Sequence, residues 1–179
     1  SDTLEPKTLA ARGDVLEVLR RAADDKDPRV RAAAAFALGV WGGPRARETL
    51  RLMLADGRAA ARYNAATGLA RHGDPASVDV LLEMLAVEAS HAGTSHSEEE
   101  DDARRLTGEV PADRPDQVVG PRQQTLIRLN ALRAIEKLLR SADAPLPRKR
   151  LTAAVHRAAH EAEVPAVRAK AAEVLGQLR

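Results

Sequence analysis

Two histidines four residues apart, His156 and His160, are the first candidates for chemistry, and Glu161 follows them directly. On a helix this spacing lets two imidazoles face one metal ion. A closed metal site needs further ligands, and the sequence supplies none at a matching spacing. We therefore interpret these residues as part of a solvated helix face and predict no bound metal and no cofactor.

Other catalytic patterns are also missing from the sequence. The chain has no Cys, which excludes disulfides, thiolate metal sites and a cysteine nucleophile. There is no Gly-rich phosphate loop, no nucleophile elbow and no Ser-His-Asp set. We predict that the protein is not an enzyme; an enzyme or metalloprotein acting through the histidine pair is the third hypothesis.

Charge is distributed unevenly along the chain. The formal net charge is +2, but residues 98–116 hold eight acids against three arginines, and residues 120–179 carry twelve Lys and Arg against five acids. The basic C-terminal part predicts, as the alternative function, sequence-tolerant binding to nucleic-acid phosphates. The residues for that alternative are Arg140, Arg148, Lys149, Arg150 and Arg157.

The acidic run lies in a segment, residues 89–122, that interrupts the repeating sequence pattern found in the rest of the chain. It lacks the alternating ligands and central glycine of a calcium loop, and it contains three prolines and little apolar periodicity. We interpret it as an insert loop within a single domain covering residues 1–179. Long loops on rigid scaffolds commonly carry function, so this insert is a candidate for specificity.

A 31-residue repeat determines the fold expectation. The pattern beginning at Val30-Arg31 returns 31 residues later at Ala61-Arg62, and it returns again after the insert at Ile127-Arg128 and at Val167-Arg168. Each copy places apolar residues at i, i+4, i+5 and i+8. That spacing marks one face of an α-helix. Aromatics form only 2% of a chain that is 44% hydrophobic, so small residues must pack between closely spaced helices. We predict an all-α solenoid of four to five stacked helix pairs.

Turn and cap residues divide each repeat into a first and a second helix. Asp27-Pro28 predicts a capped helix start, while Gly42-Gly43-Pro44 and Gly73-Asp74-Pro75 predict the turn between two helices. Leu19, Leu50 and Leu81 then recur on the second helices. After the insert we expect helices over residues 123–140, 148–161 and 166–178. Residues 9–14 are similar to residues 69–74, which predicts a truncated unit at the start.

The Asp-Pro-x-Val-Arg start, the Arg-x-x-Ala-Ala-x-x-Leu helix and the Gly-Asp-Pro turn resemble HEAT repeats, closest to the short bacterial type named for phycobilisome lyases. The resemblance covers residues 10–88 well and residues 123–179 more loosely. It implies an armadillo-type α-solenoid that serves as a scaffold or docking surface, and it implies that Arg31, Arg62, Arg128 and Arg168 tie one repeat to the next. HEAT-like hydroxylases hold iron through several His-Glu pairs, and here only His160-Glu161 matches.

The ridge of second helices is the predicted binding surface for another protein. Glu17, Glu48 and Asp79 recur every 31 residues and could receive a basic partner; we favour the interpretation that they complement the helix dipole. Trp41 and His72 stand at equivalent turns, and a turn Trp more often packs over its own helix pair. The predicted partner-binding residues are Glu17, Arg21, Trp41, Glu48, Arg51, His72, Asp79 and Glu83.

The sequence also sets expectations for the state of the protein. It contains no run of 18 or more apolar residues, so we expect a soluble protein with no membrane contact. No signal decides the compartment, and we favour the cytoplasm of a bacterial cell. We expect a monomer whose partner is another protein of unknown identity.

Overall fold

The protein folds into stacked helices. The computed structural model describes residues 6–87, 120–142 and 145–178, and within these ranges it contains α-helices and one short 3-10 helix but no strand. The elements are α1 (Pro6–Ala22), α2 (Pro28–Trp41), α3 (Pro44–Met53), α4 (Ala59–Arg71), the 3-10 helix η1 (Pro75–Ser77), α5 (Val78–Ala86), α7 (Pro121–Ser141), α8 (Arg148–Glu161) and α9 (Pro165–Leu178). The predicted α-solenoid is confirmed.

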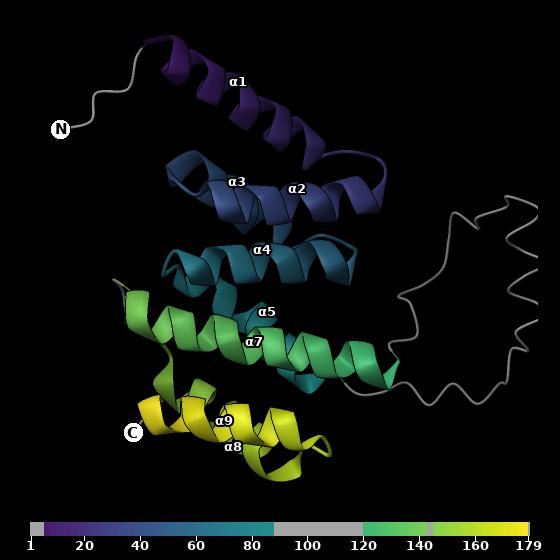
Figure 1. Cartoon of the computed structure of the whole chain (residues 1–179), viewed down its shortest axis with the longest axis vertical. Coiled ribbons are helices and arrows are strands. Elements are labelled where there is room, and N and C mark those ends of the chain that lie inside the picture. Colours follow the sequence, from purple (N-terminus) through teal and green to yellow (C-terminus); the bar gives the residue numbers. More distant parts are fainter. Residues whose placement is uncertain (1–5, 88–119, 143–144, 179) are drawn as a thin grey trace, which may run out of the picture.

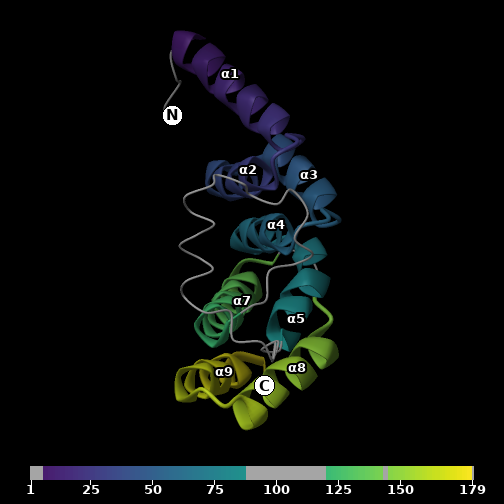
Figure 2. The ribbon, with the colours of Figure 1, turned by 90° about the vertical axis from the view of Figure 1, so that its right-hand side faces the viewer.

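The helices form two layers along the stack (Figures 1 and 2). The first helices of the repeats, α2, α4, α7 and α9, lie on one side in Figure 2, and the second helices, α3, α5 and α8, lie on the other. Helices α2 and α4 each pack against the second helix that follows them, α3 and α5, whereas α8, which follows α7, packs against α9 and α5. In the 31-residue register α1 is a second helix and α9 is a first helix. The described stack therefore begins with a second helix and ends with a first helix.

The helix starts and the turns lie where the cap and turn residues of the sequence predicted them. Asp27 caps α2 by accepting a 2.8 Å hydrogen bond from the Arg29 backbone N–H, and Asp74 caps η1 in the same way. Gly73 has a φ of +73°, and a Cβ placed on it would lie 2.0 Å from the Ser141 carbonyl oxygen. Only glycine fits this turn, because a side chain there would be strained and would also collide with the end of α7.

The first helices approach each other closely where both carry glycine. A Cβ built on Gly39 of α2 would lie 2.7 Å from the Gly68 Cα of α4, which is shorter than any ordinary carbon contact. Asn64 of α4 also donates a 2.8 Å hydrogen bond to the Ala32 carbonyl of α2. Small residues on this side of α2 therefore set the spacing between neighbouring repeats.

Two hydrophobic cores meet at α4. The first is built on α1 to α4 and contains the predicted core residue Leu50, while the second runs from α4 to α9 and contains Leu81. Both leucines are fully buried, as predicted. Ala65 and Leu69 of α4 belong to the first core, and Ala66 and Ala70 belong to the second.

Three sequence-based boundaries differ from the structure. Helix α7 begins at Pro121 rather than at residue 123, inside the predicted insert, whose residues 89–119 lie outside the described ranges. Helix α9 begins one residue early, at Pro165, whereas α8 has the predicted bounds. The truncated unit at residues 9–14 is wrong, since α1 continues through Gly13 and Asp14. Val15 stands where Pro75 follows Gly73-Asp74, so no proline stops the helix there.

Candidate functional site

The recurring arginine makes the same contact in three repeats. The Nη1 atoms of Arg31, Arg62 and Arg168 donate to the backbone carbonyl six residues earlier, at 3.0, 2.8 and 2.8 Å. Each guanidinium thus fastens its first helix to the turn that precedes it. The structural role implied by the resemblance is confirmed for these three residues.

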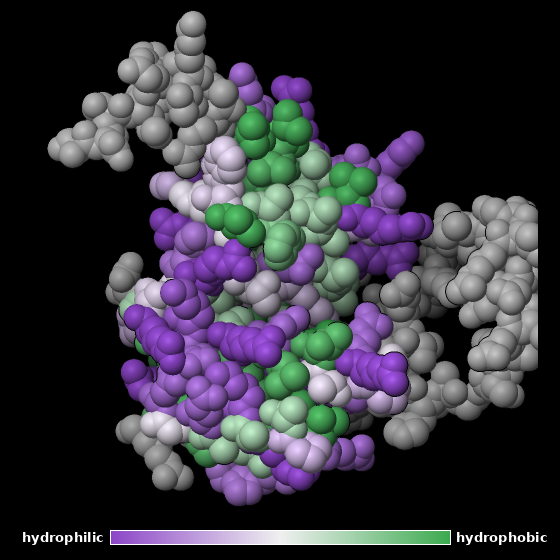
Figure 3. All heavy atoms as spheres, in the orientation of Figure 1, coloured by the Kyte–Doolittle hydropathy of each residue, from purple (hydrophilic) through white to green (hydrophobic). Residues whose placement is uncertain are grey.

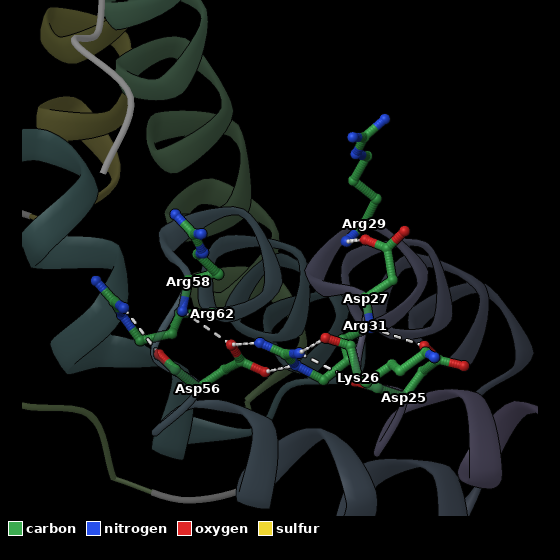
Figure 4. A network of polar contacts seen from close by, with 8 residues as sticks. All are labelled: Asp25, Lys26, Asp27, Arg29, Arg31, Asp56, Arg58 and Arg62. Atoms are coloured by element: carbon green, nitrogen blue, oxygen red, sulfur yellow. Dashed lines mark hydrogen bonds and ion pairs between the residues drawn. The ribbon is translucent and has the colours of Figure 1, made fainter. Parts of the chain in front are cut away.

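Arg31 adds a bidentate ion pair that joins successive repeats (Figure 4). Its Nε and Nη2 atoms lie 2.7 and 3.0 Å from the two Asp56 carboxylate oxygens. The Asp56 carboxylate also accepts a 2.8 Å hydrogen bond from the Arg58 backbone N–H. The hydrogen bond from Arg31 lowers the pKa of Asp56 against the opposing effect of burial, and Asp56 in turn raises the pKa of Arg31.

Arg128 occupies the same register position without this contact. Helix α7 starts seven residues before it, whereas α2, α4 and α9 start three residues before their arginines. The residue six positions earlier, Arg122, is therefore helical and offers no turn carbonyl. The Arg128 Nε is buried and has no hydrogen-bond partner within the described part of the chain. The contact that Arg31, Arg62 and Arg168 make is therefore missing at Arg128 among the described residues.

A second, half-buried network joins α7 to α9. The Lys170 Nζ lies 2.6 Å from Glu136 Oε2, and the Gln177 side-chain amide donates to Glu136 Oε1 at 3.2 Å. These two hydrogen bonds, with Lys170 the stronger contributor, lower the pKa of Glu136, and the carboxylate raises the pKa of Lys170. The pair fixes the last helix on the one before it.

Most of the charged residues predicted to bind a partner contact the protein itself. Arg51 lies 2.7 Å from the buried Asp74, Glu83 lies 2.6 Å from Arg62, and Asp79 lies 2.8 Å from Arg150 of α8. The Glu83 and Asp79 pairs connect helices, and the Arg51 pair connects α3 to the turn before η1. Glu48 is exposed on α3.

The two residues predicted at the turns are half-buried. Trp41 packs against the first hydrophobic core. The His72 Nε2 lies 2.9 Å from the Gly39 carbonyl oxygen, and the imidazole lies so close to Gly42 that a Cβ there would be 2.7 Å from it. Trp41 therefore packs within the core beside its own helix, while His72 packs on the turn of the preceding repeat. The role of both residues in binding a partner stays a prediction.

A groove of ≈ 530 Å³ opens between α1 and α3. Its base contains the buried side chains of Ala23 and Met53 and the Arg31–Asp56 pair. Helix α1 contributes one face whose residues follow helical spacing, and α3 contributes Leu52. The lining residues are Glu17, Arg20, Arg21, Ala23, Asp24, Asp25, Arg31, Thr49, Leu52, Met53, Ala55 and Asp56.

Leu52 is the residue of the groove that sequence reasoning missed. Its exposed fraction is 76%, the highest among the large hydrophobic residues of the described ranges. The neighbouring repeats carry Arg21 and Glu83 at the equivalent positions, 31 residues before and after it. An apolar residue in a charged column was the signal that could have identified the site. Glu17 and Arg21 are the two predicted residues that line the groove.

The groove is slightly acidic. It contains four carboxylates against three guanidinium groups. Glu17 pairs with Arg20 and Arg21 at 3.4 and 3.7 Å, and Asp56 pairs with Arg31. Asp24 is exposed and has no ion-pair partner within the ranges that the structure describes. The net charge of −1 therefore lies at the exposed rim, where it is available to a cation.

The basic cluster and the histidine pair both lie on or near α8. Arg140 pairs with Glu136 and Arg150 pairs with Asp79, while Arg148, Lys149 and Arg157 are exposed. The His156 and His160 rings are neighbours on the exposed face, with centroids 4.3 Å apart. Among the described residues, no group of three or more His, Cys, Asp or Glu could hold a metal ion.

Comparison with known families agrees with the repeat pattern and the helix pairs. A family model described as HEAT repeats matches residues 8–93, a span that contains most of α1 and all of α2 to α5. Residues 8–93 are therefore HEAT repeats. The match does not separate the phycobilisome-lyase type from other HEAT repeats, so that closer resemblance stays a prediction. No curated protein matches the sequence.

HEAT repeats generally mediate protein–protein interaction or scaffolding, and the family is typically non-catalytic. None of the helices in the described ranges combines the length and the apolar character needed to cross a membrane. The groove between α1 and α3 lies entirely inside the matched HEAT repeats. This groove is a concave surface where binding of a partner protein can be tested.

Proposed function

We propose that this HEAT-repeat protein is a non-catalytic module that binds a segment of another protein in the groove between α1 and α3. The exposed Leu52 carries the proposal, because burying a leucine that is 76% exposed releases an apolar surface from water. The side chain stands beside a concave surface rather than on a flat one. An exposed apolar residue at the edge of a groove is the arrangement that a partner's side chain can cover.

The groove selects the chemistry of the partner. Its base is apolar at Ala23 and Met53, so the bound segment needs at least one apolar side chain. The exposed Asp24 favours a Lys or Arg near that side chain, since opposite charges across a rim guide association and orientation. We expect a partner segment that combines an aliphatic residue with a basic one.

Binding would extend from the groove along the ridge of second helices. Glu17 and Arg21 belong to the groove, and the exposed Glu48 continues the surface along α3. Arg51, Asp79 and Glu83 take part in ion pairs within the protein. They would contribute by holding the shape of the ridge more than by contacting the partner directly.

The test is a comparison of three variants in capture experiments followed by titration with the captured protein. Leu52→Glu and Asp24→Lys should each weaken binding by tenfold or more, because one removes the apolar contact and the other reverses the charge at the rim. Ala60→Glu is the matched control, since it places an acid on an exposed position of α4 outside the groove. Equal binding by Leu52→Glu and the unchanged protein would refute the groove as the site.

Nucleic-acid backbone binding by the basic C-terminal half remains the alternative prediction. Arg148, Lys149 and Arg157 are the exposed residues that would carry it. Affinity for DNA or RNA should then fall log-linearly with salt concentration. The absence of measurable affinity at low salt would eliminate this alternative.

A further inference from the structure

Helix α8 presents a polar face to solvent, and its two histidines lie on that face. His156 and His160 are both exposed and are separated by about one helical turn. A hydrophobic area of the surface lies elsewhere, over α2 in the upper half of Figure 3, where Phe36 and Val40 are each 57% exposed. The two histidines therefore belong to a hydrated surface that small solutes can reach.

The two imidazole rings are close enough to bind one metal ion. Their centroids are 4.3 Å apart and their planes are inclined by 39°. A metal–nitrogen bond of about 2.0–2.1 Å places the metal about 3.2 Å from each ring centroid. Two imidazoles at right angles around the ion would then have centroids about 4.5 Å apart, and two at the tetrahedral angle about 5.1 Å apart. The observed separation is closest to the right-angled arrangement.

The backbone beneath the pair is fixed before any metal binds. Leu151 and Val155 of α8 are fully buried in the second hydrophobic core, so packing holds this helix in place. The two histidine backbones keep their helical spacing, and binding has to order only two exposed side chains. Once one imidazole has bound the ion, the other acts at a high effective concentration. The pair is therefore a preformed chelate.

The charges around the pair favour a cation. His160 lies in the last turn of α8, where the unpaired carbonyl groups give the helix end a partial negative charge. Glu161 and Glu163 follow it in the sequence, while Arg157 is the basic residue beside His156. Among the described residues these acids do not complete a group of three ligands, so water would fill the other positions around a bound ion.

We propose that His156 and His160 form an open chelating site for a late first-row transition-metal ion, with Cu²⁺ bound most tightly. Imidazole is a suitable ligand for these metals, and Cu²⁺ has the highest affinity among them for a given set of ligands. Right-angled positions also suit tetragonal Cu²⁺, whereas Zn²⁺ prefers a tetrahedral set. The sequence predicted no bound metal because two ligands do not close a site. An open site needs no closure, since water supplies the remaining ligands.

Titration of the full chain with Cu²⁺ tests the proposal, with calorimetry for the affinity and electron paramagnetic resonance for the bound nitrogens. His156→Asn and His160→Asn should each weaken the two-nitrogen Cu²⁺ site by tenfold or more, because each leaves a single imidazole. The other histidines are unchanged in every variant, so any binding that they contribute remains as a constant background. Mg²⁺ should not compete, because it prefers oxygen ligands.

Two double variants separate chelation from the number of histidines. Ala153→His combined with His160→Asn puts the second imidazole at an exposed position three residues before His156, on the same face, and should restore the site. Arg157→His combined with His160→Asn puts the two imidazoles on adjacent residues, which face different directions, and should not restore it. Circular dichroism of each variant verifies that the helices are retained.

The site is independent of the proposed function. Helix α8 lies at the opposite end of the described stack from α1 and the groove (Figures 1 and 2). Leu52→Glu should therefore bind Cu²⁺ like the unchanged chain while losing the partner protein, so the two proposals fail separately. Equal Cu²⁺ binding by the unchanged chain and the two single histidine variants would overturn the proposal. Equal affinity of the two double variants would also overturn it.

Discussion

Replacing glycine by alanine should have different effects at two equivalent positions of this solenoid. Gly39 in α2 and Gly176 in α9 occupy the same place in the repeat, but only Gly39 faces another helix. A Cβ at Gly39 would lie 2.7 Å from the Gly68 Cα, whereas a Cβ at Gly176 would lie in open space. The matched pair therefore separates the packing effect of the methyl group from its effect on helix propensity.

The magnitude follows from the geometry. Ordinary carbon contacts are about 3.5–4.0 Å, so α2 and α4 must separate by roughly 1 Å to admit the methyl group at Gly39. Overpacking of this kind lowers the free energy of unfolding by about 1–3 kcal/mol. The higher helix propensity of alanine raises it by up to about 1 kcal/mol. At Gly176 only the favourable contribution remains. The free energy of unfolding of Gly39→Ala should therefore lie about 1–3 kcal/mol below that of Gly176→Ala.

Urea unfolding measures this difference. With an m-value of about 2 kcal/mol per M, the unfolding midpoints should differ by roughly 0.5–1.5 M. Far-UV circular dichroism follows all the helices, and the fluorescence of Trp41, the only tryptophan, follows the first core. Measurements at low protein concentration exclude any contribution from association.

Gly68→Ala tests the same contact from the opposite side. A Cβ at Gly68 would lie 2.8 Å from the Gly39 Cα, so its effect should have the sign and size of the effect at Gly39. Gly57→Ala, where nothing lies within 4 Å, serves as a further control. If Gly39→Ala and Gly176→Ala stabilise the protein equally, the close approach of α2 and α4 is refuted.

Three further predictions concern the interior of the protein. Arg31→Met should lower the free energy of unfolding by about 1–3 kcal/mol, because it leaves the buried Asp56 carboxylate without its partner; Arg128→Met should be neutral or stabilising in the same denaturation assay, because the Nε of that arginine already lacks a partner. Glu136→Gln should make the free energy of unfolding depend less on pH at acid pH. Lys170 lowers the pKa of Glu136 below its ordinary 4.5, so the stabilisation is complete above pH 4.5 and is lost as the pH falls through the lowered pKa; an unchanged profile in thermal melts would contradict this. Leu50→Ala should cost about 2–5 kcal/mol because the side chain is fully buried; a negligible loss in urea unfolding would contradict its place in the core.

Local signals in the sequence predicted the helices well. The 31-residue period, the cap at Asp27 and the glycine turns are properties of short segments, and the structure places α2, α8 and α9 within a residue of the patterns that predicted them. Periodicity also assigned Leu50 and Leu81 to the core. These features depend on neighbours one or two turns away, which a single sequence records directly.

The candidate site depended on contacts that the sequence does not record. Asp79 pairs with Arg150, 71 residues away, and Arg51 pairs with Asp74, 23 residues away. Nothing in the spacing of these charges distinguishes a partner within the chain from a partner outside it. The angle between α1 and α3, which opens the groove, is likewise set by packing over the whole helix. Leu52 was the one visible signal, as an apolar residue in a column of charged ones.

The position of α4 between the two cores determines how the protein opens. Because α4 contributes Ala65 and Leu69 to one core and Ala66 and Ala70 to the other, neither core can be exposed completely without disturbing this helix. Its amide protons should exchange with solvent only through the largest openings, while those of α1 and α9 exchange through openings of the ends. Hydrogen exchange along the chain should therefore slow toward α4 from both directions. The central helix would be the last to lose its protection.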